Sequence, residues 1–179
     1  RDRWKTDRPS SSDVINRILA DVKVPTIAAM HGRCLGVGLE LALACNYRVA
    51  QEYCTIGMPE VILGALPYNG GTQRLPRVVG VDFAADMIAT GKVIPAKQAK
   101  AFGLVDEVFE EEHITKPALK FAESVLLRPV VAPVIANRGV KPMPDAYYEE
   151  KRQSVAKAMR NYEAPQRALD AIRAAVDCQ

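Results

Sequence analysis

Several signals that would place the chain in a membrane, on a secretory route or on a nucleic acid are missing from the sequence. No apolar run reaches the roughly 18 residues of a membrane-spanning helix, and no signal-peptide pattern is present. The 24 Lys and Arg residues are interspersed with 21 Asp and Glu residues, which leaves a formal charge of +3 and no basic stripe for nucleic acid. We therefore expect a soluble intracellular protein, cytoplasmic in a bacterium and peroxisomal or mitochondrial in a eukaryote.

Motifs for metal, redox and nucleotide chemistry are also missing. The four cysteines (Cys34, Cys45, Cys54 and Cys178) lack CxxC spacing, which favours reduced thiols over a zinc site or a disulfide framework. Neither HExxH nor a P-loop occurs, and the Gly36-Val37-Gly38 turn lacks the third glycine of a dinucleotide fingerprint. The sequence predicts no metal site.

What the chain does contain is enough apolar sequence for one globular domain. Its 179 residues are 49% hydrophobic and 25% charged, and a chain of this size buries roughly two thirds of its unfolded surface. Strand and helix patterns alternate as far as Val108, and only helical patterns follow. This order predicts an α/β fold, with a core over residues 1–112 and a helical C-terminal region over residues 113–179.

Turn residues and apolar spacing set the expected elements. A helix is expected from Asp13 to Val22, and the apolar run Thr26–Met30 predicts a strand buried on both faces. A buried helix is expected to begin near Gly38, and Pro59–Gly64 is expected to form a single turn. The other expected strands are 47–50, 54–57, 93–94 and 104–108; the other helices are 73–79, 83–89, 96–101, 119–127, 146–162 and 164–176.

Two glutamates follow glycine or proline turns in this pattern. Glu40 lies in the first turn of the helix after Gly36 and Gly38, where free backbone N–H groups favour an anion, and Glu60 follows Pro59. A pair of carboxyl groups held in different protonation states can add water to a double bond, one accepting a proton from water and the other supplying one to carbon. Two structural alternatives remain open: Glu40 as a buried partner of Arg48, and Glu60 as an ordinary first-turn residue.

Each of the other candidate residues also has a purely structural interpretation. The turn at Gly36-Val37-Gly38 is suited to an oxyanion or a phosphate, or only to close packing. His31 is more typical of a turn or core histidine than of a catalytic one. Tyr68 either lines a pocket or is an exposed loop residue, and the pair Arg74 and Arg77 either reaches a phosphate or covers the surface.

Three segments, in order, resemble the crotonase (enoyl-CoA hydratase/isomerase) superfamily across Val24 to Val108: VPTIAAMHGRCLGVGLELALACNYRVA, IGMPEVILGALPYNGGTQRLPRVVG and ATGKVIPAKQAKAFGLVDEV. The tail is similar to the region after the hydratase part of bifunctional enzymes that also carry a 3-hydroxyacyl-CoA dehydrogenase. The resemblance implies a spiral of ββα turns, incomplete at the N-terminus, with a helical C-terminal subdomain. The missing portion would supply the first strands, a second oxyanion donor and much of the coenzyme A surface.

The resemblance also implies roles for individual residues. Glu40 would activate water, Glu60 would protonate the α-carbon, and the Val37 N–H would be one donor to the thioester oxygen. Valine stands at that position where the family usually has glycine, and Tyr68 likewise replaces a glycine whose N–H helps to hold the water. The substrate-binding residues implied are Gly36, Gly38, Tyr68 and Gly70.

The function implied is hydration of trans-2-enoyl-CoA to 3-hydroxyacyl-CoA in fatty-acid β-oxidation. No cofactor is needed, since the substrate itself carries coenzyme A, and the acyl-CoA thioester is the expected partner. The protein would be a homo-oligomer, trimer or hexamer, or a monomeric bifunctional enzyme. Enoyl-CoA isomerisation, another crotonase-type reaction on acyl-CoA, and a fragment that is inactive or serves as an assembly module are the alternatives.

Overall fold

The strands form two small sheets. The computed structural model describes residues 18–19, 21–129, 135 and 138–177. One sheet has the order β1-β3-β6 and is parallel throughout; in the other, of order β2-β4-β5, β2 and β4 are parallel and β5 is antiparallel to β4. Their bounds are β1 Ile27–Met30, β2 Arg33–Leu35, β3 Tyr47–Gln51, β4 Thr55–Gly57, β5 Val93–Pro95 and β6 Glu107–Phe109.

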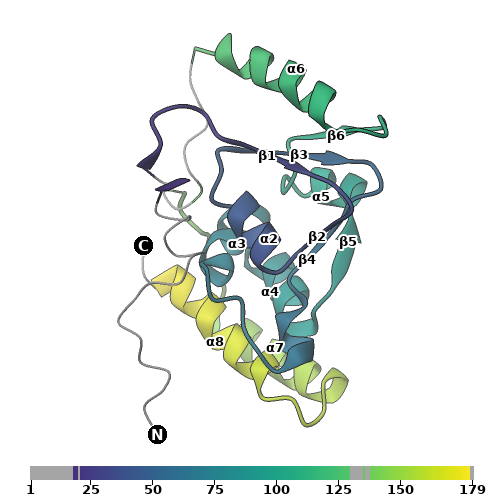
Figure 1. Ribbon diagram of the computed structural model, residues 1–179. Helices are drawn as coiled ribbons and strands as arrows, with labels where there is room; N and C mark the ends of the chain where they lie inside the picture. Colours follow the sequence, from purple (N-terminus) through teal and green to yellow (C-terminus); the bar gives the residue numbers. More distant parts are fainter. Residues whose placement is uncertain (1–17, 20, 130–134, 136–137, 178–179) are drawn as a thin grey trace, which may run out of the picture.

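Strands β1 to β4 alternate between the two sheets, β5 stays in the sheet of β4, and β6 returns to the first sheet. Helical segments follow β2, β4 and β5. Helix α2 (Val37–Ala42) follows β1 and β2. The 3₁₀ turn η1 (Pro59–Leu63), α3 (Gly71–Val79) and α4 (Val81–Thr90) follow β3 and β4, and α5 (Ala96–Ala101) joins β5 to β6. The chain therefore winds in ββα turns, as the α/β prediction required (Figure 1).

The C-terminal region is helical, as expected. Helix α6 (Thr115–Leu126) packs on β1, and α8 (Ala164–Asp177) packs on α3, α4 and α7 (Asp145–Ala158). In Figure 1, α6 lies across the sheet end of the molecule and α8 runs along the opposite end. The apolar cluster contains residues on both sides of residue 113, and the division into 1–112 and 113–179 stays a prediction.

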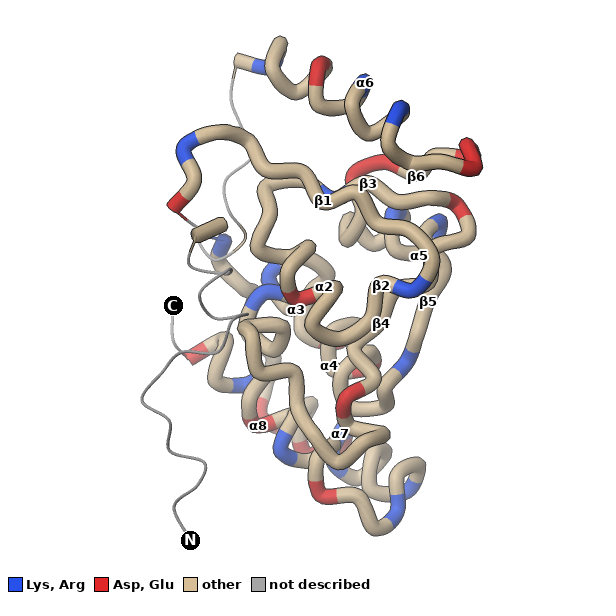
Figure 2. The backbone as a smooth tube through the Cα atoms, viewed as in Figure 1, with Lys and Arg blue, Asp and Glu red and all other residues tan. Residues whose placement is uncertain are grey.

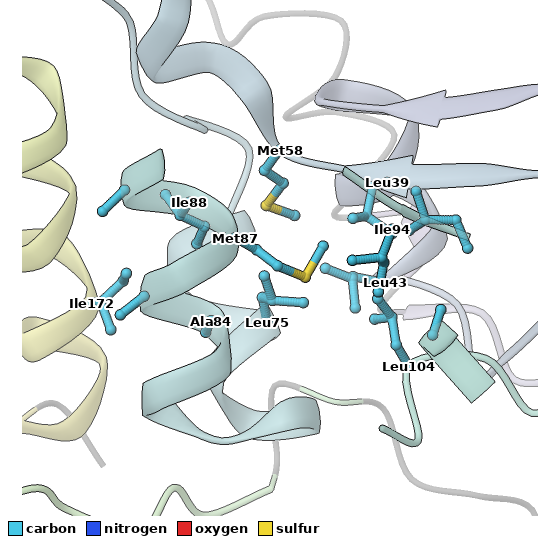
Figure 3. Packing of buried hydrophobic residues seen from close by; sticks show 14 of the residues in the cluster. Leu39, Leu43, Met58, Leu75, Ala84, Met87, Ile88, Ile94, Leu104 and Ile172 are labelled. Carbon is cyan, nitrogen blue, oxygen red and sulfur yellow. The ribbon is translucent and has the colours of Figure 1, made fainter. Parts of the chain in front are cut away.

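The core lies between the helices and the strands. The core includes Leu39 of α2, Leu43 at the C-terminal cap of α2, Leu75 of α3, Met87 of α4 and Ile94 of β5, all almost completely buried. Figure 3 shows these side chains converging, with Ile172 of α8 on the far side of α4. Burial of such side chains stabilises the fold by about 1.5–3 kcal/mol each, and it fixes α2 and α3 against each other.

Three local expectations about strands need correction, and one expected helix lies outside the residues that the structure describes. Strand β1 is not buried on both faces: Ala29 is exposed, and Ile27 and Ala28 are only partly buried. Strand β2 was not predicted, and β6 begins at Glu107 rather than at Leu104. The helix expected over 13–22 falls almost wholly on residues that the structure does not describe.

Figure 2 shows basic and acidic segments interspersed over the outer helices. Among the described helices none is both long and apolar enough to cross a membrane, and the described part of the chain has no cluster of His, Cys, Asp and Glu suited to a metal ion. Cys34, Cys45 and Cys54 are free thiols.

Candidate active site

A glycine turn leads into the helix that carries Glu40. Gly36 has φ 54° and ψ −125°, a conformation that glycine adopts far more readily than other residues. Its N–H donates to the carbonyl of Gly57 (2.9 Å), which ties the turn to the end of β4. Helix α2 begins at the next residue, so Glu40 lies in the first turn, as predicted, and it is completely buried.

The carboxylate of Glu40 is held at the amino end of helix α3. Its Oε1 accepts the backbone N–H groups of Asn69 (2.9 Å) and Gly71 (2.8 Å), and its Oε2 accepts the side-chain amide of Asn69 (3.2 Å). Arg74 of α3 donates to the Asn69 carbonyl (2.7 Å). Burial lowers the pKa of Arg74, and the charge of Glu40 opposes that shift. Three N–H donors thus fix the position of the Glu40 carboxyl group at the amino end of α3.

Arg48 does not pair with Glu40, so that alternative is wrong. The buried guanidinium donates to the carbonyls of Leu104 (2.8 Å) and Cys45 (3.1 Å), and it lies 3.4 Å from the carboxylate of Asp106. Burial lowers the pKa of Arg48, and Asp106 partly offsets this. Arg48 therefore connects β3 to the segment before β6, and it is not the partner of Glu40.

Glu60 has an environment opposite to that of Glu40. It lies in the first turn of η1, and both of its carboxyl oxygens are buried without a hydrogen-bond partner among the residues that the structure describes. Burial raises the pKa of Glu60, and the charge of Glu40 raises it further. The backbone N–H of Glu60 itself partly offsets this rise in pKa, and the loss of water around the carboxyl group decides the upward direction of the shift.

The two acids meet at the glycine turn. A Cβ placed on Gly36 would lie 2.9 Å from Glu60 Oε1, and Glu40 follows Gly36 by one turn of helix. On the other side, a Cβ on Gly71 would lie 2.8 Å from Glu40 Oε1 and 2.8 Å from the sulfur of Met58, the residue that precedes η1. Within the described part of the chain, one of these carboxyl groups has three hydrogen-bond donors and the other has none, and such unlike surroundings suit two acids to different roles.

Comparison with known proteins identifies the family. The family model for enoyl-CoA hydratase/isomerase matches residues 6–170. The chain belongs to the enoyl-CoA hydratase/isomerase family. It is 31% identical to a solved enoyl-CoA hydratase from Bacillus anthracis, with a TM-score of 0.61, and the match covers 94% of this chain and 60% of that one.

Two other solved structures match this chain with similar sequence identity, coverage and TM-score. The chain is 30% identical to DspI of Pseudomonas aeruginosa (TM-score 0.61, 83% of this chain and 58% of that chain covered). It is 26% identical to an enoyl-CoA hydratase from Thermoplasma volcanium (TM-score 0.61, 93% and 59% covered). The chain therefore spans 58–60% of the length of these three structures.

The remaining residues that the family resemblance implies lie around the same turn and loop. Val37 is the first residue of α2, where the backbone N–H has no acceptor within the helix, and Gly38 follows it. Tyr68 is 67% exposed, and Gly70 has φ 93° with Arg74 packed against it. Gly36, Val37, Gly38, Tyr68 and Gly70 stay predictions as oxyanion and substrate residues.

Asn69 and Met58 were not predicted to be part of the site. The Asn69-Gly70-Gly71 turn was expected, but nothing local in the sequence indicates that it binds the carboxyl group of Glu40, which lies 29 residues before Asn69.

His31 is exposed and borders a cavity of about 380 Å³ between β1 and α6, to which neither glutamate contributes. Arg77 donates to backbone carbonyls of Gln73 and Ala175, an arrangement that connects α3 to α8.

Proposed function

We propose that the protein containing this chain hydrates trans-2-enoyl-CoA to 3-hydroxyacyl-CoA, with Glu40 as base and Glu60 as acid. The observation that carries the proposal is the contrast between the two carboxyl groups. Glu40 accepts three hydrogen bonds, whereas the two carboxyl oxygens of the half-buried Glu60 are buried without a hydrogen-bond partner among the described residues, and burial raises the pKa of Glu60. Membership of the enoyl-CoA hydratase/isomerase family supplies the substrate class.

The reaction divides between the two acids. Glu40 takes a proton from water as the water oxygen forms a bond to C3 of the enoyl thioester. The π electrons of the C2–C3 bond move towards the thioester, whose oxygen becomes negative, and C2 then takes the proton of Glu60. Glu40 ends protonated and Glu60 ionised; after the product leaves, Glu40 releases its proton to solvent and Glu60 takes one up from solvent, which restores both groups.

The developing charge on the thioester oxygen needs donors. The Val37 N–H is one donor in this proposal, because it lies at the start of α2 between the glycine turn and Glu40. One such donor is typically worth about 3 kcal/mol of transition-state stabilisation. A second donor, and much of the coenzyme A surface, would come from parts of the fold that the longer solved relatives have and this chain does not span.

The chemistry involves no net oxidation or reduction, so the proposal includes no redox cofactor and no metal. A role in fatty-acid β-oxidation, and a place in a bifunctional enzyme beside a 3-hydroxyacyl-CoA dehydrogenase, are parts of the same proposal. The dehydrogenase would consume the 3-hydroxyacyl product that hydration forms.

The test is hydration of crotonyl-CoA by the complete gene product that carries these residues. We expect Glu40→Gln and Glu60→Gln each to lower kcat by about 10²- to 10⁴-fold, since each removes one proton-transfer group. Glu111→Gln, at an exposed glutamate, is the matched control and keeps full activity. Unchanged rates in both active-site variants contradict the proposal. Faster conversion of a 3-enoyl-CoA to the 2-enoyl isomer than hydration would assign isomerisation instead.

A further inference from the structure

We propose that the side-chain amide of Asn69 positions the water-activating carboxylate of Glu40 for the reaction. This inference rests on the hydratase function proposed above and adds a residue to it. Asn69 would touch neither substrate nor water, so it is a positioning residue that acts through Glu40. The proposal starts from one contact, in which Asn69 Nδ2 lies 3.2 Å from Glu40 Oε2.

The direction of that hydrogen bond follows from chemistry. An ionised carboxylate only accepts, so the amide nitrogen of Asn69, not its oxygen, faces Glu40. Glu40 is 0% exposed and Asn69 is 4% exposed, so bulk water does not compete for the contact. A charge-assisted hydrogen bond in such surroundings is stronger than a neutral one at the surface.

The donors are unevenly divided between the two oxygens of Glu40. Both backbone N–H groups, from Asn69 and Gly71, donate to Oε1, whereas among the residues that the structure describes Oε2 accepts only from the Asn69 side chain. A carboxylate offers about four acceptor positions, and these three donors fill two on Oε1 and one on Oε2. A single acceptor position is left, on Oε2, for the proton of the attacking water.

Removing the side chain would change the geometry of the base and leave its other contacts in place. With Asn69→Ala the two backbone N–H groups still hold Oε1. Oε2 then has two open positions, and its plane is set by Oε1 alone. The water would no longer be directed to one position, and proton transfer from water would slow.

A partial reaction separates this role from a general loss of structure. Exchange of the α-proton of butyryl-CoA with D₂O requires removal and return of a proton at C2, which the proposal assigns to Glu60, and it requires no attack by water. We expect Asn69→Ala in the complete gene product to lower kcat for crotonyl-CoA hydration by about 10- to 100-fold. KM and the exchange rate stay within about threefold of the wild type.

Two further variants complete the test. Asn69→Asp keeps the shape of the side chain but replaces the donor with a second negative charge, and it should lose more hydration than Asn69→Ala while exchange persists. Asn46→Ala is the control, because its side chain accepts hydrogen bonds from Thr26 away from the site. It should lower the thermal midpoint and leave both rates within about twofold.

The outcomes are distinguishable. A wild-type protein that exchanges the α-proton but does not hydrate crotonyl-CoA would overturn the proposed function. An active wild type whose Asn69→Ala variant hydrates normally, or loses hydration and exchange together, would overturn only the role of Asn69. If Asn69→Ala fails to fold by circular dichroism, the same two rates of Asn69→Asp decide in its place.

Discussion

Glu60 Oε1 occupies the space that a side chain on Gly36 would need: a Cβ on Gly36 would lie 2.9 Å from it. The same glycine has φ 54° and donates its N–H to Gly57 at the end of β4. Gly36 therefore positions the turn before α2 and also limits where the carboxyl group of Glu60, in η1, can lie. The geometry of the two acids depends on the absence of a side chain here.

Gly36→Ala is expected to impair both stability and hydration. An alanine at this φ is strained by about 1–3 kcal/mol, and its Cβ would push Glu60 away from its present place. We expect a loss of that size in the free energy of unfolding, measured with urea, and a fall in kcat of about 10-fold or more. Crotonyl-CoA hydration at a temperature well below the midpoint of unfolding measures the second effect.

Gly32→Ala is the matched control for that variant. Gly32 also has a positive φ of 59°, but a Cβ there would meet nothing within 4 Å. The variant should lose stability through backbone strain and keep its hydration rate. Equal losses of hydration in both variants would show that contact with Glu60 is unimportant.

Asp106→Asn tests the assignment of Arg48 as a structural residue. Asp106 accepts from the backbone N–H of Arg48 (2.7 Å) and lies beside its buried guanidinium. Loss of the charge leaves the Arg48 cation without its ion-pair partner, and we expect the free energy of unfolding to fall by about 2 kcal/mol. Hydration should be unchanged below the midpoint. A large loss of kcat at full folding would instead indicate that Arg48 influences Glu40.

Substitutions at Tyr68 test whether its backbone N–H or its side chain contributes to hydration. The ring is 67% exposed, and the resemblance to the family gives the role to the N–H. Tyr68→Ala keeps the N–H and should stay within about threefold of wild-type kcat, whereas Tyr68→Pro removes it and should lose about 10-fold or more. The comparison is made between variants that melt at similar temperatures. A larger loss in Tyr68→Ala than in Tyr68→Pro would place the function in the ring.

Local pattern was sufficient to predict where Glu40 lies, but not what holds it. A glycine turn before an apolar helix places a residue two positions after Gly38 in the first turn, whatever the rest of the fold does. The α/β alternation and the turn at Gly64 are local in the same sense. Repeated signals of this kind predicted most of the elements.

Contacts between distant segments could not be predicted in this way. The partner of Arg48 lies 58 residues away, and Asn69 lies 29 residues from Glu40. Strand β2 has only three residues, and it is a strand because β4 pairs with it some 20 residues later. The unpartnered state of Glu60 depends on Gly36 and on the core around η1, which no single segment of sequence shows.

Glu60→Gln is expected to stabilise the protein while it abolishes hydration. Burial raises the pKa of Glu60 above 4.5, so the folded state binds this proton more tightly than the unfolded state does. The contribution of Glu60 to stability is then fully present below pH 4.5 and is lost as the pH rises through the raised pKa. A neutral glutamine has no such loss, so the variant should gain about 1 kcal/mol at pH 7 relative to the wild type.

Urea unfolding at several pH values between 5 and 8 measures this difference. The advantage of Glu60→Gln over the wild type should grow as the pH rises and should be smallest at the acid end. Glu111→Gln, at an exposed glutamate, should follow the wild type throughout. Parallel curves for the wild type and Glu60→Gln would mean that Glu60 is ionised at little expense in the folded protein. A group in that state would be a poor proton donor to C2, and the division of roles between Glu40 and Glu60 would have to be abandoned.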